Sequence, residues 1–355
     1  MTDNVYEKLA AVLDRLPNGF PRTPSNVELP MLEKIFAPDE AALAGHLQGE
    51  FESIETIANR TGEPVDEVKA KLIAMAKRGM VWLDRSTPVP TRGHPGFRLA
   101  PFIVGIYEGT LERMDAELAR LFEEYMADGG AAGILKPQPA LHRVIPVHRS
   151  VKSDQILPYE DVKGLILKGK AFSVRDCICR VQQDKLGNRR CDFPLANCMG
   201  LSFSERPPRP GDISQEQATA ILEESEKAGL VHAVSNVIED VGYICNCCGC
   251  CCGVLRGITD WGIEESVARA NYFAVIDPDT CTACGLCTQR CQVKAIAQKD
   301  DVLTIDRPRC IGCGLCVTAC PEQAIRLERK PDSQIVPPPV DFETWEKLRW
   351  AGRME

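Results

Sequence analysis

A duplicated cysteine motif near the carboxyl end constrains this chain more than any other feature of its sequence. The motif reads CTACGLCTQRC at residues 281–291 and CIGCGLCVTACP at residues 310–321, and each copy has the spacing C-x2-C-x2-C-x3-C. The second copy follows the first at a constant offset of 29 residues, which also relates Gly285 to Gly314. A duplicated unit of this length predicts two similar hairpin-and-helix halves that pack against each other.

The spacing of the motif suits iron–sulfur chemistry, because it wraps three thiolates around one cubane and sends the fourth cysteine to a neighbouring cubane. The segment resembles a bacterial-type ferredoxin with two [4Fe-4S] clusters. The resemblance implies two crossed ligand sets, Cys281, Cys284, Cys287 and Cys320 for one cluster and Cys310, Cys313, Cys316 and Cys291 for the other. The chain departs from that family's pattern where Gln292, and not proline, follows Cys291. Zinc also takes four thiolates, but it has no need of two interlocked repeats.

Ten further cysteines lie in residues 171–253, and the sequence leaves their ligand roles open. They are Cys177, Cys179, Cys191, Cys198, Cys245, Cys247, Cys248, Cys250, Cys251 and Cys252. The simplest assignment gives the first four of them to a third cluster and four of the last six to a fourth. An alternative mixes the two groups, because a helix predicted between them lets the later loop fold back onto the earlier one. Zinc or a disulfide pair are further alternatives.

The Cys-Cys-Gly step in ICNCCGCCCG resembles the signature of heterodisulfide-reductase-type subunits. That resemblance implies an unusual, non-cubane cluster, although the long fixed spacings of the signature are absent. We therefore expect one or two further iron–sulfur clusters in this region, of a type that the sequence does not define.

The predicted fold class is α+β, with five segments along the chain. These are a helical and winged-helix-like domain at 1–105, a helical connector at 106–170, a cysteine-rich iron–sulfur domain at 171–265, a ferredoxin-like two-cluster domain at 266–330, and a Pro-rich tail with a short docking helix at 331–355. The winged-helix resemblance rests on two predicted helices joined at Thr61–Pro64 and on two strands that flank a polar tip at 86–96.

Three local helix signals are specific enough to be checked. The chain is expected to be helical from Pro101 to about Asp128, with an apolar stripe along one face. In the cysteine-rich domain, Ser214 and Gln217 predict a capping box at the start of a helix, and Gly229 predicts its end.

Composition and charge limit the partners of the chain. Its 355 residues carry 42 Lys and Arg against 50 Asp and Glu, a net charge of −8 to which thiolate-bound clusters add further negative charge. This argues against nucleic acid as a partner, which binds cationic surfaces, and the predicted reading helix begins with the acidic Asp66 and Glu67. The apolar runs are shorter than the ~20 residues that span a bilayer. The start of the chain does not have the pattern of a signal peptide. We therefore expect a cytoplasmic protein from an organism with an anaerobic metabolism.

The whole chain is similar to a group of uncharacterised ferredoxin-like proteins of anaerobes, which join a winged-helix-like front to a cysteine-rich middle and a dicluster end. The resemblance implies a multi-cluster electron-transfer protein or subunit that relays single electrons between redox protein partners, within an oxidoreductase complex. We find no flavin or nicotinamide motif and assign no catalytic residue. Two alternatives remain, an iron–sulfur redox-sensing transcriptional regulator that uses the winged helix, and a reductase with an unusual cluster in the middle domain.

Overall fold

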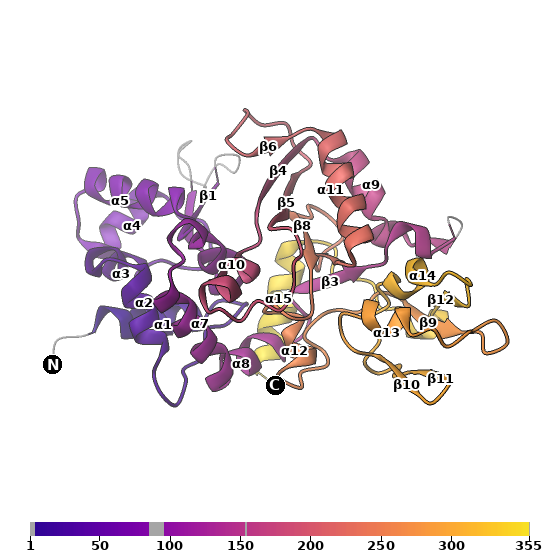
Figure 1. Ribbon diagram of the computed structural model, residues 1–355. Helices are drawn as coiled ribbons and strands as arrows, with labels where there is room; N and C mark the ends of the chain where they lie inside the picture. The colour runs from indigo at the N-terminus through magenta and orange to yellow at the C-terminus, as the bar shows by residue number, and fades with distance from the viewer. Residues whose placement is uncertain (1–3, 85–95, 153–154, 355) are drawn as a thin grey trace. The chain divides into compact units, whose positions relative to one another are not determined.

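The computed structural model of the protein describes residues 4–84, 96–152 and 155–354 (Figure 1). The chain divides into two compact units. The first contains Met1–Ile134 and Val181–Gly187, and the second contains Leu135–Arg180 and Asn188–Glu355. The described residues combine helices with sheets whose paired strands are antiparallel, which fits the predicted α+β class.

The first unit begins with five short helices and a two-stranded antiparallel sheet. They are α1 (Val5–Asp14), α2 (Glu28–Ile35), α3 (Pro38–Ala44), α4 (Ile54–Thr61), α5 (Val65–Lys77), β1 (Val81–Asp84) and β2 (Gly96–Leu99). Helix α4 starts at the Ser53 cap and ends at Gly62, whose φ of 73° suits glycine. Residues 86–95 of the predicted wing tip lie outside the described residues, and the winged-helix assignment stays a prediction.

The segment from Pro101 to Asp128 is helical, as predicted, but it consists of several short helices. The segment contains η1 (Phe102–Ile106), α6 (Tyr107–Gly109), η2 (Leu111–Arg113), α7 (Ala116–Tyr125), η3 (Met126–Gly130) and, after it, α8 (Ala131–Leu135). The chain is extended at Met114 and Asp115. The Asp115 carboxylate accepts a hydrogen bond from the backbone N–H of Leu118 at 2.8 Å, so it starts a new helix. The apolar stripe is nevertheless buried, with Phe122 stacked on Tyr107 at 3.9 Å between ring centroids.

A six-stranded antiparallel sheet forms the centre of the second unit. Its order is β3-β7-β8-β5-β4-β6. The strands are β3 (His142–Ile145), β4 (Ala171–Asp176), β5 (Ala196–Ser202), β6 (Asp212–Ile213), β7 (Val231–Ser235) and β8 (Tyr243–Cys247). In Figure 1, α9 (Val162–Lys168) and α11 (Gln215–Ala228) lie together beside this sheet. The predicted capping box of α11 is confirmed, and so is its end at Gly229.

The remaining helices of this part are short. They are η4 (His148–Ser150), η6 (Pro158–Glu160), α10 (Ile178–Lys185) and α12 (Arg256–Thr259). Helix α10 begins in the second unit, and its later residues belong to the first. Strand β4 ends at Asp176 after a register shift between Arg175 and Asp176, and Cys179 lies on α10.

The duplicated motif forms two small hairpin-and-helix halves. Strand β9 (Tyr272–Ile276) pairs with β12 (Ile325–Arg329), and β10 (Ile296–Lys299) pairs with β11 (Val302–Ile305). The helices α13 (Leu286–Arg290) and α14 (Leu315–Ala319) contact each other. Each helix follows a left-handed glycine, Gly285 with φ of 75° and Gly314 with φ of 76°.

The tail continues through η7 (Asp332–Gln334) into α15 (Phe342–Met354), and this last helix packs on the chain's own second unit. Trp345 is buried and donates from its indole N–H to the Ala140 carbonyl at 3.1 Å. Arg349 is also buried and donates to the Pro139 carbonyl at 2.9 Å. The helix of the tail therefore packs on the chain's own second unit through Trp345 and Arg349.

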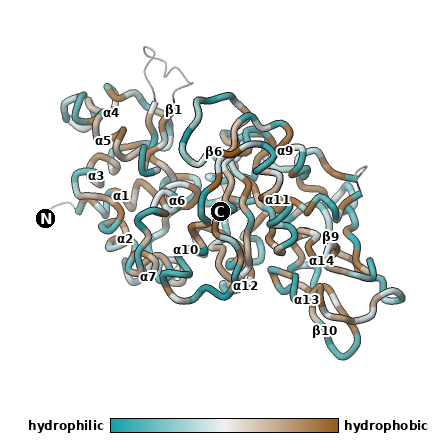
Figure 2. Tube along the Cα trace, turned by 45° about the horizontal axis from the view of Figure 1, so that its top comes forward, coloured by the Kyte–Doolittle hydropathy of each residue, from teal (hydrophilic) through white to brown (hydrophobic). Residues whose placement is uncertain are grey.

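The distribution of apolar residues agrees with a core built within each unit. Figure 2 shows hydrophobic and hydrophilic stretches in alternation along the helices and strands. Within the described parts of the chain, no helix combines the length and the apolar character that crossing a membrane requires.

Candidate metal centres

The module formed by the two halves contains two pockets, and each is lined by four cysteines. The first pocket is lined by Cys281, Cys284, Cys287 and Cys320. The second pocket is lined by Cys291, Cys310, Cys313 and Cys316. In each pocket three cysteines come from one copy of the motif and one from the other copy. Four thiols around an otherwise apolar space suit a [4Fe-4S] cluster, which is held by four thiolates.

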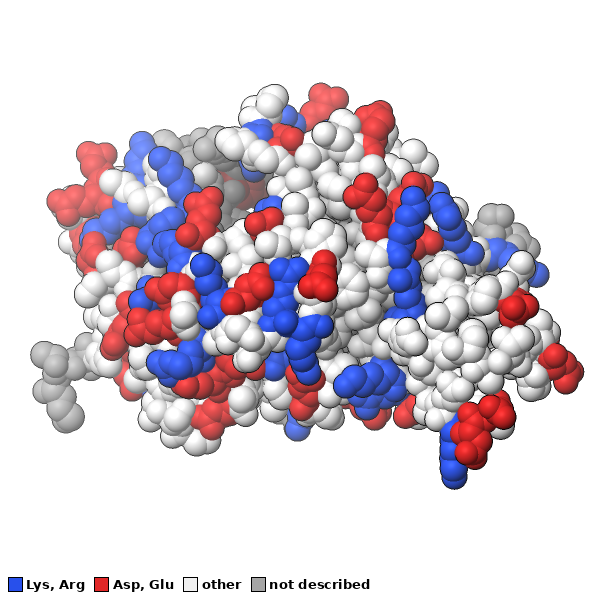
Figure 3. All heavy atoms as spheres, in the orientation of Figure 1, with Lys and Arg blue, Asp and Glu red and all other residues white. Residues whose placement is uncertain are grey.

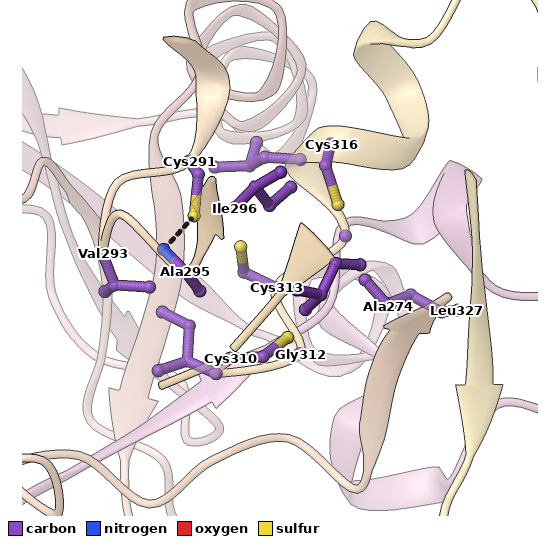
Figure 4. A pocket seen from close by; sticks show the side chains of 14 residues that line it. Ala274, Cys291, Val293, Ala295, Ile296, Cys310, Gly312, Cys313, Cys316 and Leu327 are labelled. Carbon is purple, nitrogen blue, oxygen red and sulfur yellow. Dashed lines mark hydrogen bonds between the residues drawn. The ribbon is translucent and has the colours of Figure 1, made fainter. Parts of the chain in front are cut away.

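Figure 4 shows the second pocket, with the side chains of its four cysteines around one space and Val293, Ala295 and Ile296 beside them. The Cys291 sulfur accepts a hydrogen bond from the Ala295 N–H at 3.2 Å. Such bonds stabilise negative charge on the sulfur and tune the reduction potential of a bound cluster.

The backbone around the two pockets repeats with the same offset as the sequence. The Cys320 sulfur accepts from the Ala324 N–H at 3.3 Å, as Cys291 does from Ala295. Lys294 and Gln323 are both left-handed, with φ of 55° and 52°. The duplication therefore repeats the hydrogen bonds to sulfur as well as the cysteines.

Burial differs between the cysteines of the module. Cys284 is exposed, whereas Cys287 and Cys316 are buried. Burial raises the pKa of the Cys313 thiol to about 12, and it also raises the pKa values of Cys291 and Cys316. Because only thiolates bind iron, cluster binding at the second pocket must displace these protons.

The ten cysteines of the middle region fall into two groups in space. The four-thiol group consists of Cys191, Cys248, Cys250 and Cys251, whose sulfur atoms all lie within 4.8 Å of one another. The six-thiol row contains the others, and neighbouring thiols in it are in contact in the order Cys177, Cys179, Cys252, Cys247, Cys245, Cys198. The structure thus places Cys191 beside three of the late cysteines, and it places the other three late cysteines in a row with Cys177, Cys179 and Cys198.

Strand pairing explains much of the six-thiol row. Strands β5 and β8 are antiparallel with Met199 opposite Ile244, so one further step sets Cys198 opposite Cys245. Cys245 and Cys247 lie two residues apart on β8 and therefore share one face of the sheet. Cys177 follows the neighbouring strand β4.

A buried arginine lies between the two groups, and the sequence analysis missed it. Arg180 is fully buried and donates to the Pro194 and Asn246 carbonyls and to the Asn197 side chain, at 2.7–2.9 Å. Within the described residues no carboxylate pairs with it. Burial lowers the pKa of its guanidinium, but the sulfurs of Cys177, Cys248 and Cys247 outweigh this effect and raise it. A buried cation requires a compensating negative charge, which thiolates of the neighbouring cysteines can supply.

The second pocket of the module is connected to the four-thiol group by one glutamine. The Gln292 side chain accepts from the Gly249 N–H at 2.9 Å and donates to the Gly229 carbonyl at 2.8 Å. A cavity beside this contact is lined by both Cys250 and Cys291. Gln292 is the residue that departs from the ferredoxin pattern, so the departure was visible in the sequence while its role was not.

The basic residues of α5 do not form a continuous cationic surface. The Lys71 ammonium lies 2.7 Å from the Glu63 carboxylate, and Arg78 pairs with Glu40. Figure 3 shows acidic and basic side chains interspersed over the face that it draws. Neither observation favours the alternative of DNA binding, which requires clustered positive charge.

The two halves and their four-cysteine pockets have the arrangement of a ferredoxin-type iron–sulfur module. Two family models, each described as a 4Fe-4S dicluster domain, match residues 274–327 and residues 309–346. These matches indicate an iron–sulfur electron-transfer function. Comparisons with curated proteins and with solved structures find no match.

Proposed function

We propose that this protein relays single electrons between redox protein partners, from the ferredoxin-type module to metal centres in the cysteine-rich region. In this proposal Cys281, Cys284, Cys287 and Cys320 hold one [4Fe-4S] cluster, and Cys291, Cys310, Cys313 and Cys316 hold another. Such clusters accept and release single electrons. The six-thiol row holds a further iron–sulfur cluster, whose negative charge Arg180 balances.

The contact between Gln292 and Gly249 supports the route of the relay more than any other observation. It holds the Cys291 turn against the loop that carries Cys250, and both cysteines line the same cavity. The first pocket has the opposite character, since Cys284 and the neighbouring Leu286 are exposed. We propose that a partner docks at this exposed side and that electrons leave through the side that holds Gln292.

Iron and sulfide analysis of anaerobically purified protein, with electron paramagnetic resonance of the reduced form, tests the proposal directly. We expect at least about eight irons and eight sulfides per chain from two cubanes, and more if the six-thiol row also holds a cluster. Stoichiometric zinc without inorganic sulfide would overturn the proposed function.

The role of Gln292 has its own test. Gln292→Ala removes two hydrogen bonds, each worth about 1 kcal/mol, and should slow the reduction of the centres in the cysteine-rich region several-fold. Gln298→Ala is the matched control, because Gln298 donates only to the Ala283 carbonyl of its own module. Rapid-freeze electron paramagnetic resonance after mixing with a reduced donor measures the rate. Equal rates in the two variants, with equal iron contents, would refute the route through Gln292.

A further inference from the structure

The four-thiol group differs from the pockets of the module in the spacing of its sulfur atoms. The Cys250 and Cys251 sulfurs lie 3.6 Å apart, and Cys191 lies 3.7 Å from Cys251 and 4.0 Å from Cys248. It is the one set of three or more potential metal ligands in the described chain whose ligand atoms are mutually within 4.8 Å. The eight cysteines of the module, which line pockets, do not form such a set.

These short distances suit a single metal ion. Four thiolates at about 2.3 Å from one tetrahedral metal ion lie about 3.8 Å from one another. In a cubane each thiolate binds a different iron, so the thiolates must stand farther apart around a larger inorganic core. The module leaves space for such a core, and the four-thiol group does not.

The surroundings of the group resemble those of a closed metal site. Cys248 and Cys251 are buried and pack with Leu230, and Phe193 covers the same cluster. No carboxylate belongs to the group. A site with four protein thiolates and no open position is typical of structural tetrathiolate centres.

Hydrogen bonds within the protein hold the loop that carries Cys248, Cys250 and Cys251. The Cys252 N–H donates to the Cys248 carbonyl at 3.1 Å, and the Thr259 hydroxyl donates to the Gly249 carbonyl at 2.9 Å. A divalent ion with four thiolates has a net charge of −2, and the buried Arg180 guanidinium contacts the Cys248 sulfur. The cation therefore lowers the cost of burying this negative charge.

We infer that Cys191, Cys248, Cys250 and Cys251 bind one divalent metal ion, zinc or iron, in a tetrathiolate site that contains no inorganic sulfide. Binding releases the thiol protons to solvent and joins the segment before β5 to the loop after β8. The loop then presents Gly249 to Gln292. Zinc would make the site a structural support of the contact, whereas iron would make it a one-electron centre beside Cys291.

Metal and sulfide counting on Cys250→Ser tests the inference in the full-length protein. We expect this variant to lose one metal ion per chain and no sulfide. Cys313→Ser is the matched control, because a cubane ligand should take about four irons and four sulfides with it. Loss of iron and sulfide in equal numbers from Cys250→Ser would overturn the inference.

Spectroscopy of the unsubstituted protein decides the matter if Cys250→Ser is not recovered. X-ray absorption at the zinc edge should show four sulfur neighbours at about 2.3 Å, or Mössbauer spectra should show one mononuclear iron apart from the clusters. Either result supports the site and identifies its metal. If the protein retains its inorganic sulfide but shows neither signal, the inference of a tetrathiolate site is refuted and the electron-transfer proposal stands. If the protein contains no inorganic sulfide, the electron-transfer proposal is refuted.

Discussion

The two halves of the ferredoxin-type module share their cysteine spacing and their backbone, but different parts of the chain cover them. The half that begins at Cys281 carries an exposed cysteine, Cys284, at its surface. The half that begins at Cys310 meets residues 135–180, since the Val147 N–H donates to the Cys313 carbonyl at 2.9 Å. The duplication therefore determines the local chemistry of the two pockets. The surrounding chain determines that one pocket faces solvent and the other faces the protein.

Removal of one cysteine from each half should produce the largest effects. Cys313→Ala and Cys284→Ala should each lose one cubane, about four irons and four sulfides per chain. The helical circular dichroism signal of the first unit should persist in both, because that unit is compact by itself. Loss of all iron, or of the helical signal, from either variant would contradict the independence of the pockets and of the units.

The side of the module that meets residues 135–180 also has a pH-sensitive carboxyl group. Glu160 is 2% exposed and accepts from the Asn271 N–H at 2.8 Å, and burial raises its pKa from 4.5 to about 7. The folded chain therefore keeps this proton to a higher pH than the unfolded chain. The free energy of unfolding should fall as pH rises from about 4.5 to about 7, by about 3 kcal/mol in total.

Glu160→Gln provides the control for this pH dependence, because glutamine keeps an acceptor oxygen for Asn271 and cannot ionise. Anaerobic thermal unfolding between pH 5 and 8 should give a flatter profile for the variant, with a higher stability than the parent protein above pH 7. Parallel profiles for the two proteins would show that Glu160 does not titrate in this range.

A further predicted effect comes from the pair of left-handed glycines, which have nearly the same φ. A Cβ atom at Gly314 would overlap the Ser150 side chain, whereas one at Gly285 would meet only the flexible end of Gln298. Alanine at either position costs roughly 1 kcal/mol for the left-handed backbone, and overpacking adds about 1–3 kcal/mol at Gly314. Chemical denaturation should therefore give Gly314→Ala a lower free energy of unfolding than Gly285→Ala. Equal losses of unfolding free energy in the two variants would mean that the Ser150 side chain moves aside without a cost.

Local patterns made several parts of the fold predictable. The capping box at Ser214 and the helix end at Gly229 depend on residues only a few positions apart, and both are confirmed. The segment from Pro101 to Asp128 is helical as expected, but its apolar periodicity continues across Met114 and Asp115, where the backbone is extended and one helix ends before the next begins. Periodicity reports which face is buried, and it does not report where the chain bends.

The sequence by itself determined that the carboxyl-terminal part is a ferredoxin-type module, because all its cysteines fall in two short repeats whose spacing is specific to this chemistry. Only the tertiary structure decided how the other ten cysteines group. Cys191 meets Cys251 across 60 residues of chain, and Cys198 meets Cys245 through the register of two strands. The same holds for Gln292, whose partner Gly249 is 43 residues away. Contacts of this kind depend on how strands and loops pack, which no local spacing encodes.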